Sequence, residues 1–340
     1  METFLLLSPE ERRLAYQQVN AEMQLQALSV EKDFWVCWTL RELFTLPHIG
    51  EHLTFKGGTS LSKAWRLIKR FSEDIDIVVD KEVLGFGGDA DPEKAPSKTK
   101  RKARLKALME ACREWVQTKL QPALADRLGS KLRDQDWRLE VDPDLLDGQC
   151  LLFHYPSAFP VETAGYVRPV VKIELGGRSD DWPSDKQTIQ PYVADLFPAL
   201  MPNAALKVRV LASERTFWEK ACLLHEETFR RHDEPHRPRM ARHYYDLWCL
   251  LEAGVGERAL ADLELFHRVV EHREIFFHVS GVDYATHKPG TFRLVPPKAH
   301  IESWRADYGK MLGPMFWGDV PDFDEILRTV SAFEGRFNKI

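Results

Sequence analysis

The chain has 340 residues and a formal net charge of −5 at neutral pH, so it is long enough for two packed lobes and is not a general binder of polyanions. Any contact with nucleic acid would need a local basic surface. The apolar content of 44% is typical of a globular protein, and no stretch has the length of a membrane span. The five cysteines form no C-x-x-C pair, which argues against a zinc site or a disulfide framework. With an N-terminus that lacks the basic segment of a signal peptide, these features predict a cytoplasmic protein without a membrane contact.

Two helices are expected before Pro47. Ser8 has the pattern of a helix cap, because a proline follows it directly and Glu11 stands three residues further on. A second helix begins near Ser29 and is apolar on more than one face, which predicts burial against a sheet. The charged residues Glu31–Asp33 are interpreted as solvated side chains at the N-terminus of this helix.

The segment Thr54–Asp80 is predicted to form a strand, a glycine turn, a short helix, a loop and a second strand. Gly57 and Gly58 stand where the first strand must turn into the helix, and Thr59 or Ser60 is expected to cap that helix. A turn of this kind at the start of a helix offers backbone N–H groups to a phosphate.

Two aspartates stand at the head of the second strand of this segment. Side chains alternate along a strand, so Asp74 and Asp76 point to one side while Ile75 and Ile77 point to the core. A carboxylate pair of this kind can bind a divalent metal ion. The turn and the pair together indicate phosphoryl chemistry.

A basic helix is predicted from Lys98 to about Leu128, after a loop rich in Gly, Pro and Asp. The residues Lys98–Lys106 supply six positive charges in a short span. Two interpretations stay open, a solvated helix face and a surface that binds RNA or a partner protein.

Three further strands are expected at Trp137–Val141, Cys150–Tyr155 and Arg168–Gly176. A two-metal site for nucleotidyl transfer needs a third acidic group on a neighbouring strand, and Glu174 has the position for it. The alternative is an ion pair between Lys172 and Glu174 on an exposed sheet face.

From about Leu211 the periodicity is helical, except around Val279–Pro297. The chain is therefore expected to be an α+β (mixed α/β) protein with two domains. Residues 1–205 would form the mixed domain with the basic helical insertion at about 95–130, and residues 206–340 a mostly helical C-terminal domain.

Two charged residues stand out in the helical part. Lys220 lies on a helix that Ser213 can cap, and it either extends to solvent or meets a nucleoside triphosphate as a point charge. Asp246 lies in an apolar helix, where an acid is costly to bury unless it is paired. Arg242, one turn earlier, is the expected partner, and orientation of Lys220 is the alternative role of Asp246.

The densest group of histidines has no spacing typical of metal ligands. We interpret its members as surface or RNA-facing residues: His225, His232, His236 and His243.

Several motifs in this order resemble the nucleotidyltransferase AbiEii/AbiGii toxin family, within the polymerase-β-like nucleotidyltransferase superfamily. FKGGTSLSK followed by SEDID is the most specific part. The full set is EKDFWV (Glu31–Val36), FKGGTSLSKAW (Phe55–Trp65), RFSEDIDI (Arg70–Ile77), VKIEL (Val171–Leu175), ERTFWEKACLL (Glu214–Leu224), RHYYDL (Arg242–Leu247), HKPGTFRLVPP (His287–Pro297) and FDEI (Phe323–Ile326).

The resemblance implies a polymerase-β-like core, in which helices flank a mixed sheet, and a C-terminal helical lobe. It implies Mg²⁺-dependent transfer of a nucleoside monophosphate from a nucleoside triphosphate. The metal ligands would be Asp74 and Asp76, and the further essential groups Lys56, Lys220 and Asp246. Glu174 is added to the metal ligands from its position in the strand order, not from the resemblance. The nucleotide would be held by Lys56, Gly57, Gly58, Thr59, Ser60, Lys63 and Lys220.

The resemblance also implies a toxin of a toxin–antitoxin or abortive-infection system, with an antitoxin protein as partner and the tRNA 3′ end as the expected acceptor. The basic segments Lys98–Lys106 and Arg230–Arg242 are where an RNA backbone would lie. Transfer to a protein or a small molecule is one alternative, and a non-catalytic module that binds RNA or the antitoxin is another. A phosphate on Ser72, two residues before Asp74, is a further hypothesis, since its charge would oppose the metal site. An ordinary loop serine is the alternative there.

Overall fold

The computed structural model describes residues 1–340 except 73, 134, 146, 161–167, 231–236 and 314. The chain forms two compact units. The first comprises Met1–Ala64 and Phe71–Leu211, and the second comprises Trp65–Arg70 and Ala212–Ile340.

Three helices begin the first unit: α1 (Glu2–Leu5), α2 (Pro9–Met23) and α3 (Ala27–Phe44). The predicted helix start at Ser8 is confirmed, because Ser8 and Glu11 form a complete capping box and a proline occupies the first turn. Such a cap contributes about 1 kcal/mol to helix stability.

The interpretation of the α3 charges as solvated is wrong. Glu31 is 0% exposed, Lys32 4% and Asp33 7%. Glu31 accepts hydrogen bonds of 2.6 Å from both Ser157 Oγ and the Ala158 N–H. Because a buried charge must be paired or hydrogen-bonded, these contacts explain how α3 can carry charges inside the unit.

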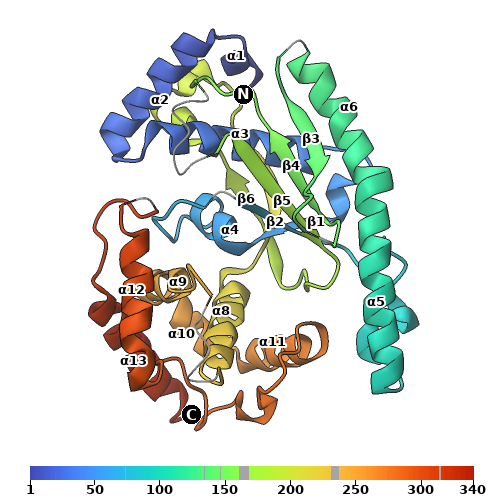
Figure 1. Ribbon diagram of the computed structural model, residues 1–340, viewed down its shortest axis with the longest axis vertical. Helices are drawn as coiled ribbons and strands as arrows, with labels where there is room; N and C mark the ends of the chain where they lie inside the picture. The colour runs from blue at the N-terminus through green and yellow to red at the C-terminus, as the bar shows by residue number, and fades with distance from the viewer. Residues whose placement is uncertain (73, 134, 146, 161–167, 231–236, 314) are drawn as a thin grey trace. The chain divides into compact units, whose positions relative to one another are not determined.

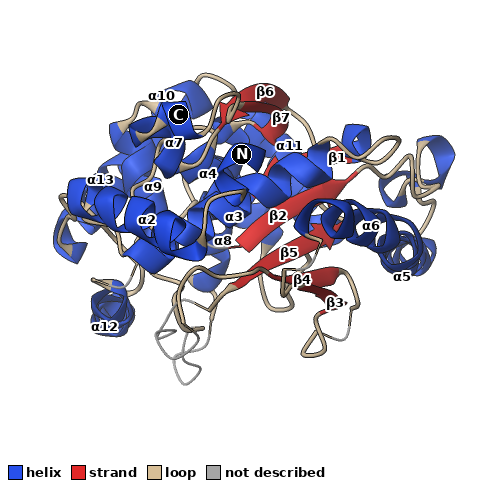
Figure 2. Cartoon of the chain, turned by 90° about the horizontal axis from the view of Figure 1, so that it is seen from above, coloured by secondary structure: helices blue, strands red, loops and turns tan. Residues whose placement is uncertain are grey.

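In the described part of the chain, one seven-stranded mixed sheet has the order β3-β4-β5-β2-β1-β7-β6 (Figure 2). The pairs β1–β7 and β2–β5 are parallel and the others antiparallel. The strands are β1 (Leu53–Lys56), β2 (Asp74–Val79), β3 (Arg138–Val141), β4 (Cys150–His154), β5 (Val170–Gly176), β6 (Ser184–Ile189) and β7 (Leu206–Leu211). The expected mixed α/β class is confirmed, while β6 and β7 were not predicted.

One face of this sheet holds the core of the first unit. Ile75 on β2 and Phe153 on β4 are fully buried. Helix α3 lies across this face of the sheet (Figure 1). The rings of its Trp35 and Trp38 each have their centroid 5.9 Å from that of Phe153. Each such aromatic pair adds about 1 kcal/mol beyond its buried area. The alternation predicted for β2 therefore directs Ile75 and Ile77 to the side of α3 and Asp74 and Asp76 to the opposite face.

The expected order of strand, turn, helix, loop and strand in Thr54–Asp80 is confirmed, with α4 (Gly57–Lys63) between β1 and β2. The capping prediction is wrong. The N-cap is Lys56, without a side-chain cap, and Thr59 and Ser60 lie inside the helix.

The basic helix extends further than predicted. It runs through α5 (Lys98–Trp115), a π turn (Val116–Leu120) and α6 (Gln121–Leu132). The π turn precedes Pro122, which has no N–H for a regular helical bond. Leucine, valine or cysteine occupies every fourth position along the buried side: Leu108, Cys112, Val116, Leu120, Leu124, Leu128 and Leu132. Short 3₁₀ turns (Gly88–Ala90 and Pro92–Lys94) precede this helix. A further short helix of the first unit is α7 (Tyr192–Leu196).

The second unit is helical, as its periodicity predicts. Trp218 packs against Phe266, Phe333 and Phe337, with ring centroids 4.7, 6.0 and 5.4 Å away. Its main helices are α8 (Ser213–Glu227), α9 (Arg242–Glu252), α10 (Val255–Leu260), α11 (Leu263–Phe276), α12 (Ile301–Met311) and α13 (Phe323–Phe337). The prediction that Ser213 caps α8 is wrong, because the N-cap of this helix is Ala212. None of the helices among the described residues combines the length and apolarity needed to cross a membrane.

Candidate active site

Five charged residues lie on one face of the sheet. Asp76 on β2 stands opposite Lys56 on β1 and Glu174 on β5, and Asp74 stands opposite Lys172 on β5. Directly paired residues of neighbouring strands point to the same side, and all of these side chains are partly exposed. The register thus brings the acids predicted from β2 and β5 onto one face.

The glycine turn lies directly beside this face. Gly57 has φ +78°, a left-handed conformation, and a Cβ built on it would overlap the Asp76 Oδ2 atom. Lys56 donates from Nζ to Ser179 Oγ at 3.1 Å. Gly57, Gly58 and Lys56 are partly exposed. A glycine is therefore required at position 57 both by the turn and by the closeness of the Asp76 carboxylate.

The hydroxyl groups of α4 are turned inward. Thr59 and Ser60 are 0% exposed. The Thr59 hydroxyl lies 2.8 Å from Ser72 Oγ and 2.5 Å from the Asp74 carbonyl oxygen. The Ser60 hydroxyl donates to the Gly57 carbonyl at 2.8 Å. These two side chains therefore stabilise the turn from within, and a ligand at the turn would meet backbone at Gly57 and Gly58.

Glu174 is paired with Lys172. The Lys172 Nζ lies 2.6 Å from Glu174 Oε1, as the ion-pair alternative anticipated. Partial burial opposes the charge of Lys172, but Glu174 outweighs it and raises the pKa of Lys172 to about 12. Within the described residues, no group of three or more His, Cys, Asp or Glu side chains has the arrangement of a metal site. The assignment of Asp74, Asp76 and Glu174 as metal ligands therefore stays a prediction.

Lys63 points away from the turn that it follows. It is 5% exposed, and its Nζ lies 2.6 Å from Asp33 Oδ1 on α3. Burial opposes the charge of Lys63, but the neighbouring Asp33 carboxylate overrides it and holds the pKa of Lys63 above its ordinary value. This pairing does not suit the expected contact with a nucleotide.

Asp246 and Lys220 form a buried ion pair in the second unit. Asp246 is 0% exposed, and its Oδ2 lies 2.8 Å from Lys220 Nζ. Arg70 binds both carboxylate oxygens of Asp246, with its Nε at 2.6 Å and its Nη2 at 2.9 Å. The prediction that Arg242 pairs with Asp246 is wrong. Arg70, which is distant in the chain, makes the bidentate contact instead. The alternative, contact between Asp246 and Lys220, agrees with this geometry.

This group of buried charges carries an excess of positive charge. Burial acts to raise the pKa of Asp246, but Arg70 and Lys220 outweigh it and hold the pKa well below its ordinary value. Burial lowers the pKa of Lys220. His243, whose Nδ1 lies 3.4 Å from Lys220 Nζ, has a pKa well below its ordinary value because of burial and the nearby cations. A neutral imidazole at His243 can accept at Nδ1 from the ammonium group of Lys220.

The interpretation of His225 as a surface residue is wrong. It is 0% exposed, accepts at Nδ1 from the Arg293 N–H at 2.9 Å, and has Nε2 2.9 Å from Thr286 Oγ1. His243 is only partly exposed. His232 and His236 lie outside the described residues, as do residues 231–236 of the expected RNA-facing segment Arg230–Arg242.

Sequence reasoning missed Asp33 and Arg70 as members of these arrangements. Both stand within motifs that carry the family resemblance, EKDFWV and RFSEDIDI. Their partners are distant in the chain, 176 positions away for Arg70. The motifs were therefore the available signal, since no local periodicity points to either contact.

Comparison with known proteins confirms the family expected from the motifs. The family model described as nucleotidyl transferase AbiEii toxin, type IV TA system, matches residues 38–329. No curated protein sequence matches the chain. Among solved structures, MenT4, the nucleotidyltransferase toxin Rv2826c of Mycobacterium tuberculosis H37Rv, is 18% identical over 96% of this chain and 92% of its own, with a TM-score of 0.41.

Proposed function

We propose that this chain, which belongs to the AbiEii nucleotidyltransferase toxin family of type IV toxin–antitoxin systems, transfers a nucleoside monophosphate from a nucleoside triphosphate to RNA. The observation that carries the proposal is the position of Asp74 and Asp76. They leave the same side of β2, are partly exposed, and lie beside the Gly57 turn. A carboxylate pair next to accessible backbone at a turn suits metal-bound triphosphate.

A divalent cation, Mg²⁺ in our proposal, would be held by Asp74 and Asp76. Hard oxygen ligands on one strand face fit this ion, which usually keeps several waters and also binds the phosphates of its substrate. When bound, it would neutralise triphosphate charge during in-line displacement. Glu174 would join only after it leaves Lys172, so we assign it the role of binding or activating the acceptor hydroxyl.

The remaining groups act on the triphosphate by charge and position. Lys56 stands opposite Asp76 and is partly exposed, which suits a phosphate oxygen. The backbone at Gly57 and Gly58 would approach the phosphates without side-chain hindrance. By the family resemblance, Lys220 is a further essential residue. Its 2.8 Å contact with Asp246 fixes the direction of the ammonium group.

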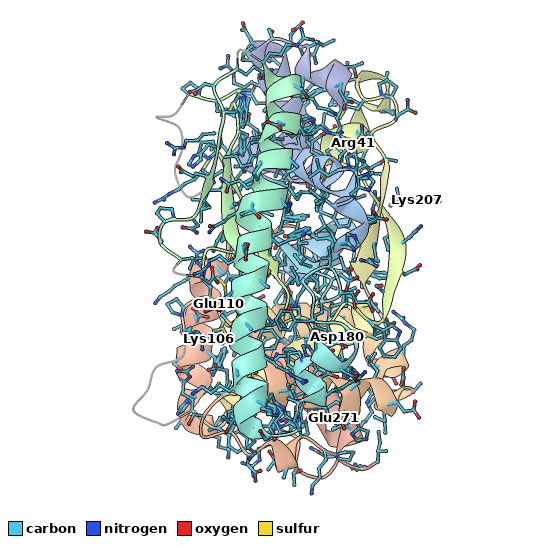
Figure 3. All side chains as sticks on the ribbon, turned by 90° about the vertical axis from the view of Figure 1, so that its right-hand side faces the viewer. Arg41, Lys106, Glu110, Asp180, Lys207 and Glu271 are labelled. Atoms are coloured by element: carbon cyan, nitrogen blue, oxygen red, sulfur yellow. The ribbon has the colours of Figure 1, made fainter. Side chains whose placement is uncertain are left out.

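We propose RNA, and tRNA in particular, as the acceptor because of the exposed lysines of α5. Lys98, Lys102 and Lys106 are exposed and follow one another at every fourth position, so they lie on one side of the helix. Figure 3 shows Lys106 and Glu110 on α5. Lys106 is 3.8 Å from Glu110, a weak pair at the end of this row. A row of cations fits a phosphate backbone. An antitoxin protein is the partner that the family implies.

One experiment tests the proposal. The purified protein is incubated with Mg²⁺, each labelled nucleoside triphosphate in turn, and total tRNA. We expect label in the RNA. Label in the protein or in a small acceptor would move the proposal to the corresponding alternative, and no transfer with any nucleotide would favour a module that only binds.

The Asp74→Ala variant should abolish transfer while it stays folded, because it removes half of the carboxylate pair. Asp185→Ala on the edge strand β6 is the matched control and should keep activity. Asp185 is exposed, and its carboxylate accepts hydrogen bonds from the neighbouring Lys186 N–H and Gln187 Nε2. Undiminished transfer by Asp74→Ala would contradict the metal assignment.

A further inference from the structure

The last residue of α4 joins three helices of the first unit. Lys63 Nζ lies 2.6 Å from Asp33 Oδ1 on α3 and 3.4 Å from the ring centroid of Tyr192 on α7. The other carboxylate oxygen of Asp33 accepts from the Tyr192 N–H at 2.8 Å. Lys63 is 5% exposed and Asp33 7%. One buried carboxylate thus binds the end of α4 and the start of α7 to α3.

The position of α4 matters at its other end. Its first residue, Gly57, leaves no room for a Cβ beside Asp76 Oδ2. A helix of seven residues is about 10 Å long and moves as one body. A shift of Lys63 would therefore be carried to the turn, and the turn cannot move toward β2 without meeting the Asp76 carboxylate.

We propose that Asp33 and Lys63 are positioning residues, which hold α4 so that the Gly57–Gly58 turn and Asp76 keep the spacing needed for metal-bound triphosphate. Lys63 acts through Asp33 and does not contact the nucleotide. This inference rests on the proposed function for its kinetic consequence, while the placement of α4 is a property of the fold that can be measured separately.

The kinetic test compares Asp33→Asn, Lys63→Met and the double variant. Asp33→Asn keeps an acceptor for the Tyr192 N–H but removes the charge. We expect each single variant to raise the KM for nucleoside triphosphate at least tenfold, and the double variant to be no worse than the poorer single, because both substitutions break one interaction. Lys63→Arg, which keeps the pairing charge, should recover most of the loss.

A nucleotide contact by Lys63 would give a different result. In that case Asp33→Asn would leave the lysine able to bind, so its KM would stay near that of the wild type while Lys63→Met would raise it. That outcome would overturn the inference. Equal KM values for all variants would overturn it as well.

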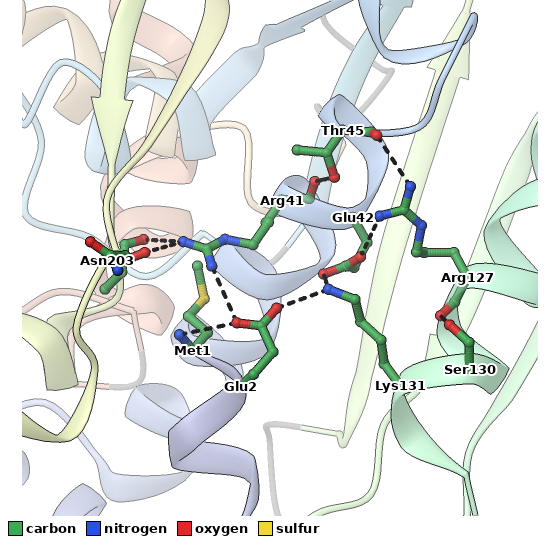
Figure 4. A network of polar contacts seen from close by, with 10 residues as sticks. Met1, Glu2, Arg41, Glu42, Thr45, Arg127, Ser130, Lys131 and Asn203 are labelled. Atoms are coloured by element: carbon green, nitrogen blue, oxygen red, sulfur yellow. Dashed lines mark hydrogen bonds and ion pairs between the residues drawn. The ribbon is translucent and has the colours of Figure 1, made fainter.

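A second buried ion pair on α3 provides the matched control. Glu42 is 0% exposed and lies 2.8 Å from Lys131 and 3.7 Å from Arg127, both on α6 (Figure 4). Glu42→Gln should destabilise the protein but leave the KM of its folded fraction unchanged. A rise in KM equal to that of Asp33→Asn would assign the effect to general loss of stability and contradict the proposal.

Amide hydrogen exchange tests the placement of α4 without any activity. In Asp33→Asn, amides of Gly57–Lys63 should exchange at least tenfold faster relative to those of β2, whereas Glu42→Gln should leave this ratio unchanged. Faster exchange together with an inactive wild type would support the positioning pair and refute the proposed function. Unchanged exchange in α4 would refute the positioning pair, whatever the activity.

Discussion

At the scale of single residues, the candidate site depends on glycine residues and their backbone groups more than on hydroxyl side chains. From the sequence, the hydroxyls of Thr59 and Ser60 were expected to contact phosphate. In the structure they donate hydrogen bonds to the backbone carbonyl oxygens of Asp74 and Gly57. The partly exposed part of the turn is Gly57 and Gly58. The close approach of Gly57 to Asp76 therefore defines the shape of the site more than any hydroxyl does.

Gly57→Ala tests this closeness. The substitution places a methyl group on Asp76 Oδ2 and also strains a residue with φ +78°, so transfer should fall at least 100-fold. Gly88→Ala is the control, because Gly88 also has a positive φ, +57°, but an added Cβ meets nothing within 4 Å. The assay is nucleotide transfer by folded protein. Equal activity of the two variants would contradict the role of the close contact with Asp76.

At the scale of elements, α5 carries its charges at the end where they stabilise it least. Its first turn begins with Lys98 and contains no acid. Cations near a helix N-terminus oppose the helix dipole, each at a cost of roughly 0.3–1 kcal/mol. Lysines at every fourth position also repel one another. A surface that is unfavourable for the helix itself favours a role in binding an anionic partner.

The double variant Lys98→Glu with Lys102→Glu should therefore gain stability and lose affinity for RNA. The helix should become slightly more stable, while affinity for tRNA should fall tenfold or more near 0.1 M salt and depend less steeply on salt. Lys186→Glu with Lys207→Glu, two exposed lysines on β6 and β7, is the control with equal charge change. Thermal unfolding and filter binding at several salt concentrations measure the two effects. Equal loss of affinity in both pairs would indicate a general charge effect instead of a surface on α5.

At the scale of the whole molecule, stability should decrease on mild acidification because two histidines are buried in the neutral form. Burial lowers the pKa of His225 to about 4 and that of His287 to about 3. The unfolded chain takes up these protons near pH 6.5, well before the folded chain does. Their neutral packing therefore contributes stability that is present above pH 6.5 and is lost as the pH falls toward the folded-state pKa values.

Each of these histidines should lower the free energy of unfolding by about 2 kcal/mol between pH 7 and pH 5. Urea unfolding of the second unit at a series of pH values measures the slope. His225→Asn should be less stable at neutral pH but lose less on acidification, whereas His267→Gln, at an exposed position of α11, should keep the wild-type slope. A slope unaffected by either substitution would show that other groups control the acid response.

The sequence by itself determined the features that depend on neighbours in the chain. Alternation along β2 and β5 predicted which side chains face the core and which carboxylates face outward, since side chains on a strand point in turn to opposite sides. The Ser8 cap, the Gly57–Gly58 turn and the family were also predictable from local sequence. Each is encoded in a few consecutive residues.

Only the tertiary structure decided which charges meet. Asp33 was interpreted as a solvated residue and is instead paired with Lys63, while Asp246 is held by Arg70 and not by its helical neighbour Arg242. The edge strand β6 is mostly polar and exposed, so no hydrophobic pattern in the sequence predicts it. Ion pairs between distant segments leave no periodic signal, because their formation depends on how helices and strands pack and on the high cost of burying a charge alone.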